Sequence, residues 1–446
     1  MLGFEANYDG LIGPTHNYGG LSEGNLASAR NKGLIAAPRA AALEGLAKMK
    51  LMADHGLVQG VLPPHQRPFL PALRELGYSG SDEEILSRAW AENPVLVRNF
   101  MSASPMWAAN AATISPSADT DDGRLHFTPA NLSTMLHRSI EHEQTGRALR
   151  VAFPGSRFAH HKALPIQATF SDEGAANHVR LCANHGAQGV ELFVYGRDAL
   201  AGESGTQFPA RQSLQACQTI VRHHRLDPAR TVFARQSARA IDAGAFHNDV
   251  VCVGALNCLF YHEHAFGDTD ALQAAIRQAA KGLFEPVFVE VSEDDVPLGE
   301  AITSYLFNSM LVQMPGSSRL TLIAPVETEE NAYTKAYCEK LVSGNGPIGA
   351  VHYVDVRQSM RNGGGPACLR LRIAMNEAEL AAANPDMVMN DALYTRLTEW
   401  VRRHYREELA PDTLGSADLM RESFTALDEL TGILGLGSDF YPFQRV

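Results

Sequence analysis

The most informative stretch of the chain reads Asn362-Gly363-Gly364-Gly365-Pro366-Ala367-Cys368-Leu369-Arg370-Leu371-Arg372-Ile373. Three consecutive glycines disfavour a helix and allow the backbone positive φ angles or a close approach to another group. Hydrophobic and polar residues then alternate, which predicts a strand over 368–374. Cys368 is therefore expected where a glycine loop becomes a strand. Its thiol there is either a reachable nucleophile or simply a small buried apolar group.

Composition narrows the class of protein. The chain has 446 residues, of which 45% are hydrophobic and 20% charged, as in an ordinary globular protein with a large core. A net charge of -12 argues against binding to nucleic acid or to an anionic membrane. No hydrophobic run approaches the ~18 residues of a membrane span, and no secretory signal is visible near Met1. Six cysteines without a C-x-x-C pair fit neither a disulfide framework nor a zinc site, so we expect a cytoplasmic protein.

Short strands alternate with helices along the chain, which indicates an α/β fold. The expected strands are 149–153, 191–195, 231–234, 250–254, 257–261, 286–291, 320–326, 351–356 and 368–374. The expected helices begin near Pro38 and near Asp82 and continue with 131–143, 174–185, 207–224, 269–281, 328–342, 388–408 and 416–434. No long Ser/Gly linker interrupts the chain, so we expect residues 1–446 to form a single catalytic domain.

A second stretch, His247-Asn248-Asp249, leads into a hydrophobic run. The period of a strand would place His247 and Asp249 on one face at its mouth. The histidine could then act as an acid or base and the carboxylate could bind a cation. The same residues could equally be the polar start of a strand without any catalytic role. The nearby His262-Glu263-His264 offers no further ligand spacing, so we expect no metal site.

Two other stretches carry candidate polar residues. Asp172 and Glu173 precede Gly174, which suits either a helix N-terminus or a carboxylate that serves a histidine or a cationic substrate. Asn110 is a polar member of an alanine-rich run that would pack tightly as a helix. A cysteine, a histidine and a carboxylate permit nucleophilic catalysis without specifying the substrate.

These residues resemble those of the guanidine-modifying (pentein) superfamily, and within it the succinylarginine dihydrolase family. The glycine loop with Cys368, His247-x-Asp249 and an upstream glutamate carry the superfamily resemblance. The closer resemblance covers essentially the whole chain and rests on 10–16, 20–25, 102–110, 172–178, 246–249, 304–309 and 362–368.

The resemblance implies a fold, a reaction and a set of site residues. The fold would be a five-bladed α/β propeller of ββαβ modules, and the enzyme a cytoplasmic homodimer without cofactor or metal. The reaction would convert N-succinylarginine and two waters to N-succinylornithine, two ammonia and carbon dioxide, in arginine catabolism. Cys368 would be the nucleophile, His247 the acid/base and Glu173 its partner carboxylate. Substrate would be bound by Gly19, Gly20, Leu21, Ser22, Glu23, Gly24, Asn25, Leu26, Ala27, Ser28, Asn110, His137, Arg138, Arg211, Asp249 and Asn362.

Chemistry agrees with this assignment but leaves alternatives open. A guanidinium carbon is poorly electrophilic, so attack requires a thiolate, which a bound cation would favour. Asp249 would pair with the guanidinium, and Arg138 and Arg211 would anchor the succinyl end. A deiminase that stops at a ureido product, a cysteine-dependent amidase or peptidase, and an inactive metabolite-binding protein remain alternatives.

Overall fold

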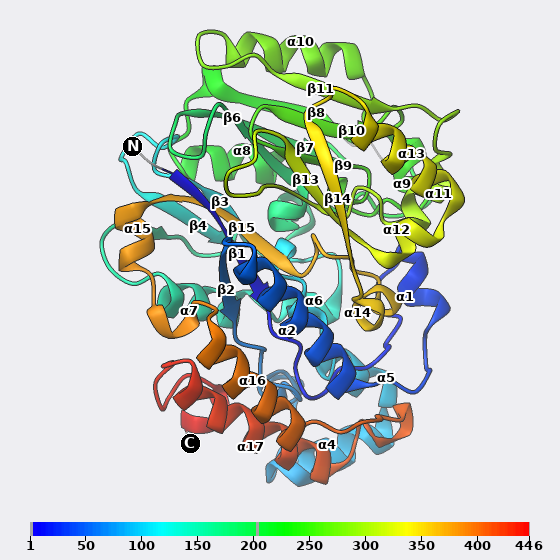
Figure 1. The fold of residues 1–446 in the computed structure, drawn as a ribbon. Helices are drawn as coiled ribbons and strands as arrows, with labels where there is room; N and C mark the ends of the chain where they lie inside the picture. The colour runs from blue at the N-terminus through cyan, green and yellow to red at the C-terminus, as the bar shows by residue number, and fades with distance from the viewer. Residues whose placement is uncertain (1–2, 202–204, 446) are drawn as a thin grey trace.

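The computed structural model describes residues 3–201 and 205–445, which form an α/β protein of small mixed sheets (Figure 1). Within these residues the strands make five sheets of three strands each. In their order within each sheet they are β15 (Arg370–Asn376), β1 (Gly3–Gly10) and β2 (Val58–Leu62); β3 (Ala112–Ser115), β4 (Leu125–Pro129) and β5 (Phe158–His160); β6 (His178–Cys182), β7 (Gly189–Tyr195) and β8 (Thr231–Arg235); β9 (Cys252–Ala255), β10 (Cys258–His262) and β11 (Val287–Val291); β12 (Met310–Gln313), β13 (Leu320–Pro325) and β14 (Ile348–Val354).

Each sheet repeats one pairing pattern. Its first two strands are antiparallel, and its second and third strands are parallel. Four of the sheets use consecutive strands, whereas the fifth joins β15 from the end of the chain to β1 and β2 from its beginning, side by side in Figure 1. The register runs from Gly3 opposite Asn376 to Asp9 opposite Arg370, so this sheet joins the first and the last of the described strands.

The strand that follows the glycine loop is explained by its alternation. Leu371, Ile373 and Met375 are buried, whereas Arg372 and Ala374 between them are partly exposed. The expected strand over 368–374 is therefore confirmed, with its start at Arg370.

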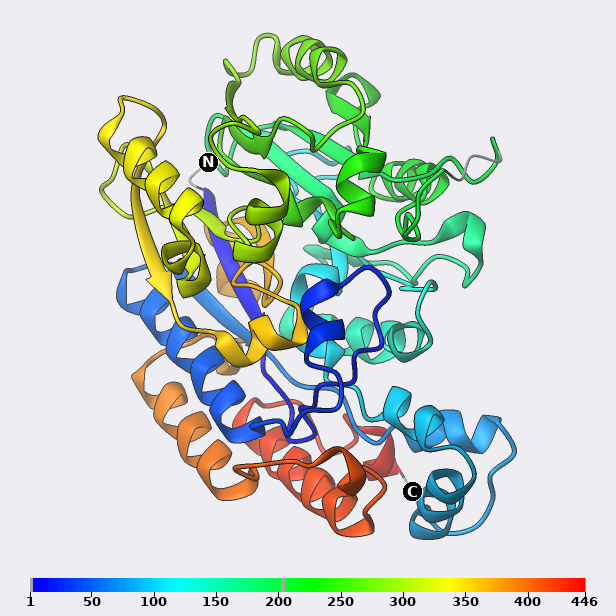
Figure 2. The same ribbon diagram turned by 90° about the vertical axis from the view of Figure 1, so that its right-hand side faces the viewer.

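Helices pack outside the sheets (Figure 2). They are α1 (Leu26–Arg30), α2 (Pro38–Asp54), α3 (Leu70–Glu75), α4 (Asp82–Glu92), α5 (Pro94–Phe100), α6 (Leu136–Ser139), α7 (His142–Ala152), α8 (Leu214–His223), α9 (Ala238–Asp242), α10 (Thr269–Ala280), α11 (Leu298–Ser304), α12 (Val326–Glu330), α13 (Ala332–Ser343), α14 (Arg357–Asn362), α15 (Glu377–Ala382), α16 (Asp391–His404) and α17 (Ala417–Ile433). The long α2 lies against α16, which in turn packs on α17.

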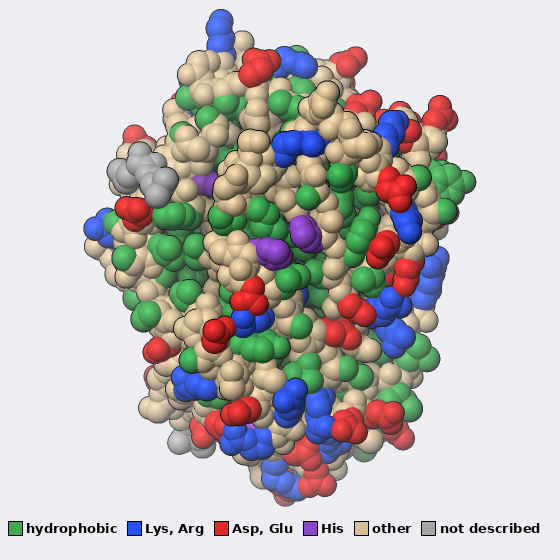
Figure 3. Space-filling view, in the orientation of Figure 1, with side chains coloured by type: hydrophobic (Ala, Val, Ile, Leu, Met, Phe, Trp, Pro, Cys, Tyr) green, Lys and Arg blue, Asp and Glu red, His purple; other side chains and the backbone are tan. Residues whose placement is uncertain are grey.

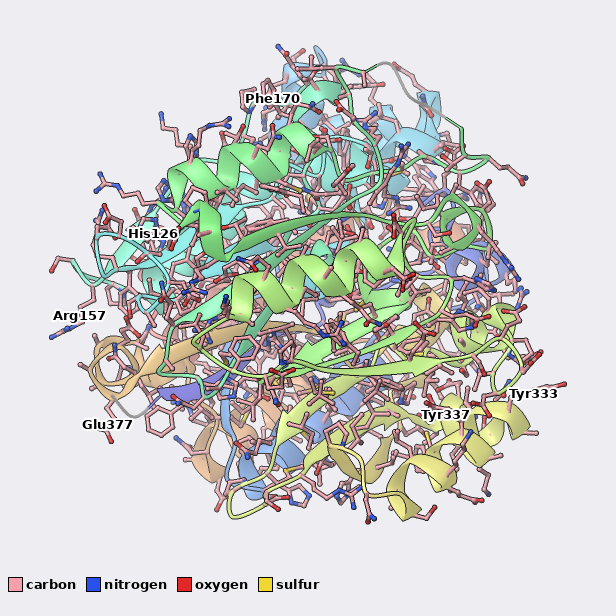
Figure 4. The ribbon with its side chains drawn as sticks, turned by 90° about the horizontal axis from the view of Figure 1, so that it is seen from above. His126, Arg157, Phe170, Tyr333, Tyr337 and Glu377 are labelled. Atoms are coloured by element: carbon pink, nitrogen blue, oxygen red, sulfur yellow. The ribbon has the colours of Figure 1, made fainter. Side chains whose placement is uncertain are left out.

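Amphipathic spacing decides which face of a helix meets the sheets. On α13, for example, Tyr337 is buried while Tyr333 is 49% exposed, and Figure 4 shows Tyr333 at the edge of the molecule. The outer surface mixes acidic and basic side chains, as Figure 3 shows on one face. No helix within the described ranges is both long and apolar enough to cross a membrane.

A polar cavity of about 90 Å³ lies between the inner strands of several sheets. Residues of β1, β3, β6, β9 and β15 line it, and so do Asn248, Asp249 and Ala367. The cavity therefore runs from the strands to the backbone beside Cys368.

Four expected elements differ from the structure. Residues 149–152 belong to α7, which Phe153 follows, rather than to a strand, because Thr145, Ala148, Leu149 and Ala152 bury one helical face. Residues 174–185 are not a helix: Gly174 has φ +67°, a short 3-10 turn ends at Asn177, and β6 follows with buried side chains. Only Leu136–Ser139 is helical within 131–143 before α7 begins. The alanine-rich run at 102–112 likewise forms short 3-10 turns before β3.

Candidate active site

Glycines shape the loop that carries Cys368. Gly363 ends α14 with φ +96°, a conformation that favours glycine. A Cβ on Gly364 would lie 2.4 Å from the indole nitrogen of Trp107, and one on Gly365 would lie 2.8 Å from the backbone oxygen of Asn308. The glycines are therefore required for close packing, and the loop holds Cys368 with only 3% of its surface exposed.

Two polar groups meet the sulfur of Cys368. Nδ2 of Asn308 donates a hydrogen bond to Sγ over 3.1 Å, and Oδ2 of Asp249 lies 3.6 Å from Sγ. Burial and the neighbouring Asp249 raise the pKa of the Cys368 thiol well above its ordinary value. Burial raises the pKa of Asp249 to about 7. The thiol is therefore held in its neutral form, beside a carboxyl group for which the described part of the chain offers no cationic partner.

His247 forms a second pair with Glu173. Nε2 of His247 lies 2.8 Å from Oε2 of Glu173, and both residues are almost fully buried. Burial lowers the pKa of His247 to about 4. Burial alone would raise the pKa of Glu173, but its bond with His247 lowers that pKa below the usual range. At neutral pH an ionised Glu173 thus accepts the Nε2–H of a neutral imidazole.

A chain of polar contacts fixes the other nitrogen of this imidazole. The guanidinium of Arg138 donates to Oδ1 of Asn110 over 3.3 Å, which turns Nδ2 of Asn110 toward Nδ1 of His247 at 3.2 Å. Nδ1 consequently carries the lone pair and is the nitrogen available as a base. Asn110 is also next to Ala109, whose backbone N–H donates to the carbonyl of Cys368, so this chain adjoins the nucleophile loop.

The expectation that His247 and Asp249 share one face of a strand was wrong. Residues Asn248–Val250 form a 3-10 turn, and β9 begins only at Cys252. The turn sends His247 toward Glu173 and Asp249 toward Cys368. The two side chains therefore serve two adjacent pairs instead of presenting themselves side by side on a pleated strand.

The expected substrate loop, Gly19–Ser28, lies against the other site residues. Nδ2 of Asn25 donates to the carbonyl of Gly363 over 3.0 Å, and the side chain of Ser22 lies 3.4 Å from Nε2 of His137. The backbone carbonyl of Glu23 accepts a hydrogen bond from Arg211. Ser22, Glu23 and Asn25 thus connect the loop to three segments of the site and close it over them.

The remaining predicted residues are also buried in this region. His137 and Arg138 lie on the short helix α6, and Asn362 is the last residue of α14, immediately before the glycine loop. Thr134, just before α6, joins this segment to the His247–Glu173 pair, because its hydroxyl donates to Oε1 of Glu173 over 2.8 Å. The structure therefore brings Cys368, His247, Glu173 and most of the predicted substrate-binding residues into one region, whereas the side chain of Glu23 is exposed.

Buried positive charge accompanies these residues. Arg138 pairs with Glu141, with its Nε 3.0 Å from Oε1. Arg211 stacks over Phe246 at 5.0 Å, and within the described residues its guanidinium has no carboxylate partner. Burial lowers the pKa of Arg211, and its Nε has no hydrogen-bond partner. Such a cation is suited to an anionic group of a ligand.

Two residues of this region were missed in the sequence. Asn308, which contacts the sulfur directly, lies inside the stretch 304–309 that carries the family resemblance, so a signal existed without a role attached to it. Arg67 is a buried guanidinium whose charge is felt at His137 and at Glu141. Nothing in its sequence setting, a proline-rich segment, indicated that position.

A separate group of ligating side chains is formed by Glu263, His264 and Glu293, whose ligand atoms lie within 4.8 Å of one another. Glu293 already accepts hydrogen bonds from Arg239 and from the backbone of Leu298. A cation there would have to compete with Arg239, so the group gives no support to a metal centre at the candidate site.

Comparison with known proteins supplies the family. The profile of the succinylarginine dihydrolase family matches residues 3–444. The chain is 60% identical over 443 residues to N-succinylarginine dihydrolase 2 of Caulobacter vibrioides, covering 99% of both chains. It is 54% identical over 448 residues to the N-succinylarginine dihydrolase of Shewanella sediminis, covering 100% of both.

Solved structures show the fold. The N-terminal domain of ArgZ, in a form covalently bound to a reaction intermediate, superposes with a TM-score of 0.50 at 13% identity, covering 82% of this chain and 97% of that domain. The apo form of ArgZ, an arginine dihydrolase from cyanobacteria, also gives a TM-score of 0.50, covering 86% of this chain and 42% of ArgZ. The fold is thus the pentein fold that the sequence resemblance implied. Together with the full-length sequence matches, this places the chain in the succinylarginine dihydrolase family.

Proposed function

We propose that the protein hydrolyses N-succinylarginine with two waters to N-succinylornithine, two ammonia and carbon dioxide, as a step of arginine catabolism. The full-length similarity to enzymes with that name supports the substrate. One observation carries the proposal: the thiol of Cys368 faces the carboxyl group of Asp249 at 3.6 Å, and no cationic side chain within residues 3–201 and 205–445 pairs with either group. A bound guanidinium would supply the cation that both groups need in order to ionise.

Ionisation of the nucleophile is coupled to substrate binding in this proposal. The thiol and Asp249 hold a proton in common while the site is empty, because burial disfavours two adjacent anions. A bound guanidinium offers paired N–H donors to Asp249 and a positive charge to the sulfur. The proton then passes to His247, and the thiolate attacks the guanidinium carbon to form a tetrahedral adduct.

His247 moves protons in both halves of the reaction. It delivers a proton to the first departing ammonia, and Glu173 stabilises the imidazolium that carries this proton. The neutral imidazole then takes a proton from water, which attacks the thiouronium carbon. A second cycle at the same carbon releases the second ammonia and finally carbon dioxide.

The far end of the substrate is held by the buried cations. Arg211 and Arg138 bind the carboxylates of the succinylated end, which matches the lack of a carboxylate partner for Arg211. The loop 19–28, Asn110, His137 and Asn362 complete the substrate site. Since Asn25 and Glu23 already bind Gly363 and Arg211, the loop opens to admit substrate.

The architecture proposed here is a five-bladed α/β propeller. The repeated pairing pattern of the sheets supports five ββαβ blades around the polar cavity, with β15 and β1 completing one blade. We take residues 1–446 as one catalytic domain, because β15 pairs with β1 across the length of the chain. A cytoplasmic homodimer belongs to the same proposal and rests on the family resemblance alone.

Product identification tests the function. The purified protein is incubated with N-succinylarginine or with free arginine, and products are identified by mass spectrometry while ammonia is counted. We expect N-succinylornithine with two ammonia per substrate and a strong preference for the succinylated compound. A ureido product with one ammonia would make the protein a deiminase, and hydrolysis of an unrelated amide in preference to guanidino compounds would favour the amidase alternative.

A further inference from the structure

Asn308 occupies a distinctive position beside the nucleophile. Its side chain is fully buried and lies just before β12, in a segment that follows the left-handed residue Tyr305. Among the described residues it is the only side chain that donates a hydrogen bond to Sγ of Cys368. This contact is with the atom that carries the chemistry.

The orientation of the Asn308 amide is dictated by its other partners. Oδ1 accepts hydrogen bonds from the backbone N–H of Gly365 over 3.0 Å and of Cys368 over 3.3 Å. An amide turned the other way would point its NH2 group at two N–H donors. Nδ2 therefore has to face the sulfur, and the backbone carbonyl of Asn308 adds a third bond to the loop by accepting from Ala367.

The other side chains around the sulfur do not favour a negative charge. Asp249 lies 3.6 Å away as a potential anion, and Tyr305 is buried and uncharged. The backbone N–H of Gly365 lowers the pKa of the thiol, but burial and Asp249 still hold that pKa well above its ordinary value. Asn308 adds a preorganised side-chain N–H aimed at Sγ, which favours the thiolate without competing with the substrate's cation.

We propose that Asn308 is a further catalytic residue, which stabilises the thiolate of Cys368 when it attacks and again when it leaves. The inference rests on the proposed role of Cys368 as nucleophile. On ionisation the S–H bond breaks, the proton passes to His247 and the electron pair stays on sulfur. On breakdown of the final adduct the C–S bond breaks, and its electron pair returns to the same sulfur beside Nδ2. In the covalent adduct the sulfur is uncharged, so the hydrogen bond favours the states before and after it.

Asn308→Asp separates this role from a purely structural one. The variant keeps an oxygen for the N–H groups of Gly365 and Cys368 but replaces the donor that faces sulfur by an anionic oxygen. The measurement is the rate of alkylation of Cys368 by iodoacetamide at pH 9, followed on the peptide by mass spectrometry. Loss of a hydrogen bond to a charged group raises the thiol pKa by roughly one to two units, so alkylation should be about ten- to a hundred-fold slower.

The sign of the effect tells the two roles apart. A loosened loop would expose Cys368 and speed alkylation, whereas loss of thiolate stabilisation slows it. Asn308→Ser, which retains a small oxygen acceptor without the amide donor, should be slowed as well, and it serves if Asn308→Asp does not fold. Asn390→Asp is the matched control, because the Asn390 side chain only accepts a bond, from Leu393 at the start of α16.

Two results would overturn the proposal, namely alkylation in both Asn308 variants within about twofold of the native rate, or alkylation that is faster. Turnover of Cys368→Ser is measured alongside. If Cys368→Ser is inactive while the Asn308 variants react normally, only the role of Asn308 fails. If Cys368→Ser turns over normally, the nucleophile itself is wrongly assigned.

Discussion

Sγ of Cys368 lies 3.6 Å from Oδ2 of Asp249, so the proposed nucleophile and the proposed partner of the substrate's guanidinium are direct neighbours. Burial together with Asp249 raises the pKa of the thiol, and burial raises that of Asp249 to about 7. Without a bound cation the Cys368 thiol is therefore mostly protonated and a poor nucleophile. A cation placed between the two groups would stabilise the ionised form of each and so lower both pKa values.

The first prediction compares a cationic and a neutral alkylating agent of the same shape. 2-Chloroacetamidine carries a positive charge that 2-chloroacetamide lacks. The carboxylate of Asp249 should bind this cationic reagent beside Sγ, as it would bind a guanidinium. We expect inactivation by the amidine to be faster by at least about tenfold, equivalent to ~1.4 kcal/mol. Asp249→Asn should remove the difference. Equal rates for the two reagents in the native protein would contradict the coupling.

The second prediction concerns binding by Asp249. Asp249→Asn keeps the shape of the side chain but removes its charge, so affinity for N-succinylarginine should fall. A lost charge-assisted hydrogen bond is worth about 1.5–3 kcal/mol, or roughly ten- to a hundred-fold in Kd. Isothermal titration in a Cys368→Ser background measures this without turnover. Unchanged affinity would remove the assigned role.

The third prediction concerns His247, which should transfer protons without contributing much to binding. His247→Asn should bind substrate almost normally and lose about 10²–10⁴-fold in kcat. If adduct hydrolysis becomes slow, intact-protein mass spectrometry should detect substrate less one ammonia on Cys368. A variant that turns over at the native rate would exclude His247 as the acid/base.

The fourth prediction separates the two buried arginines. The Arg211 guanidinium donates to the loop carbonyl of Glu23 and lies over the ring of Phe246, so Arg211→Ala should mainly raise KM and narrow the preference for N-succinylarginine over arginine. Arg138 also orients Asn110 against His247, so Arg138→Ala should lower kcat as well. Steady-state kinetics with both substrates tests this. Full discrimination in both variants would place the carboxylate anchor elsewhere.

The fifth prediction is a loss of stability in acid from a cluster of buried histidines. Nδ1 of His126 lies 2.9 Å from Nε2 of His161, and both ring nitrogens of His224 are held by the hydroxyls of Ser115 and Thr128. His126, the member of the cluster labelled in Figure 4, belongs to β4. Burial lowers the pKa of His161 to about 4 and also lowers those of His126 and His224.

The sign follows from these directions. A histidine whose folded pKa is depressed contributes stability that is complete above the unfolded pKa near 6.5 and is lost as the pH falls toward the folded pKa. Because burial lowers the pKa of His224 well below its ordinary value, the free energy of unfolding should decrease steadily as the pH falls below about 6.5. Urea unfolding of His224→Gln should show a shallower pH dependence than the native protein, with the exposed His352→Gln as control. An unchanged slope would refute the assignment.

The sequence predicted the parts of the fold that depend on local patterns. Glycine chemistry and strict alternation indicated the Cys368 loop and β15, and the long periodic helices α10, α16 and α17 were expected at nearly their observed positions. The pairing of β1 with β15 joins the two ends of the chain, and no local pattern in either strand reveals it. β6 was mistaken for a helix because Ala175, Ala176 and the acids before Gly174 imitate a helix start.

The same limit applies to the site. The identities of Cys368, His247 and Glu173 came from family resemblance, whereas their arrangement depends on turns that periodicity does not describe. The 3-10 turn at Asn248–Val250 separates His247 from Asp249. Asn308 could not be assigned a role from its sequence, because its importance lies in the direction of one amide set by two backbone donors of a distant loop.

Turnover and binding by Cys368→Ser test most directly whether this sulfur attacks the guanidinium carbon. A hydroxyl is a far weaker nucleophile than a thiolate near neutral pH, so kcat should fall by orders of magnitude while N-succinylarginine still binds in isothermal titration. Cys252→Ser, which changes another buried cysteine beside the polar cavity, is the matched control and should retain most activity. Near-native turnover by Cys368→Ser would contradict the mechanism.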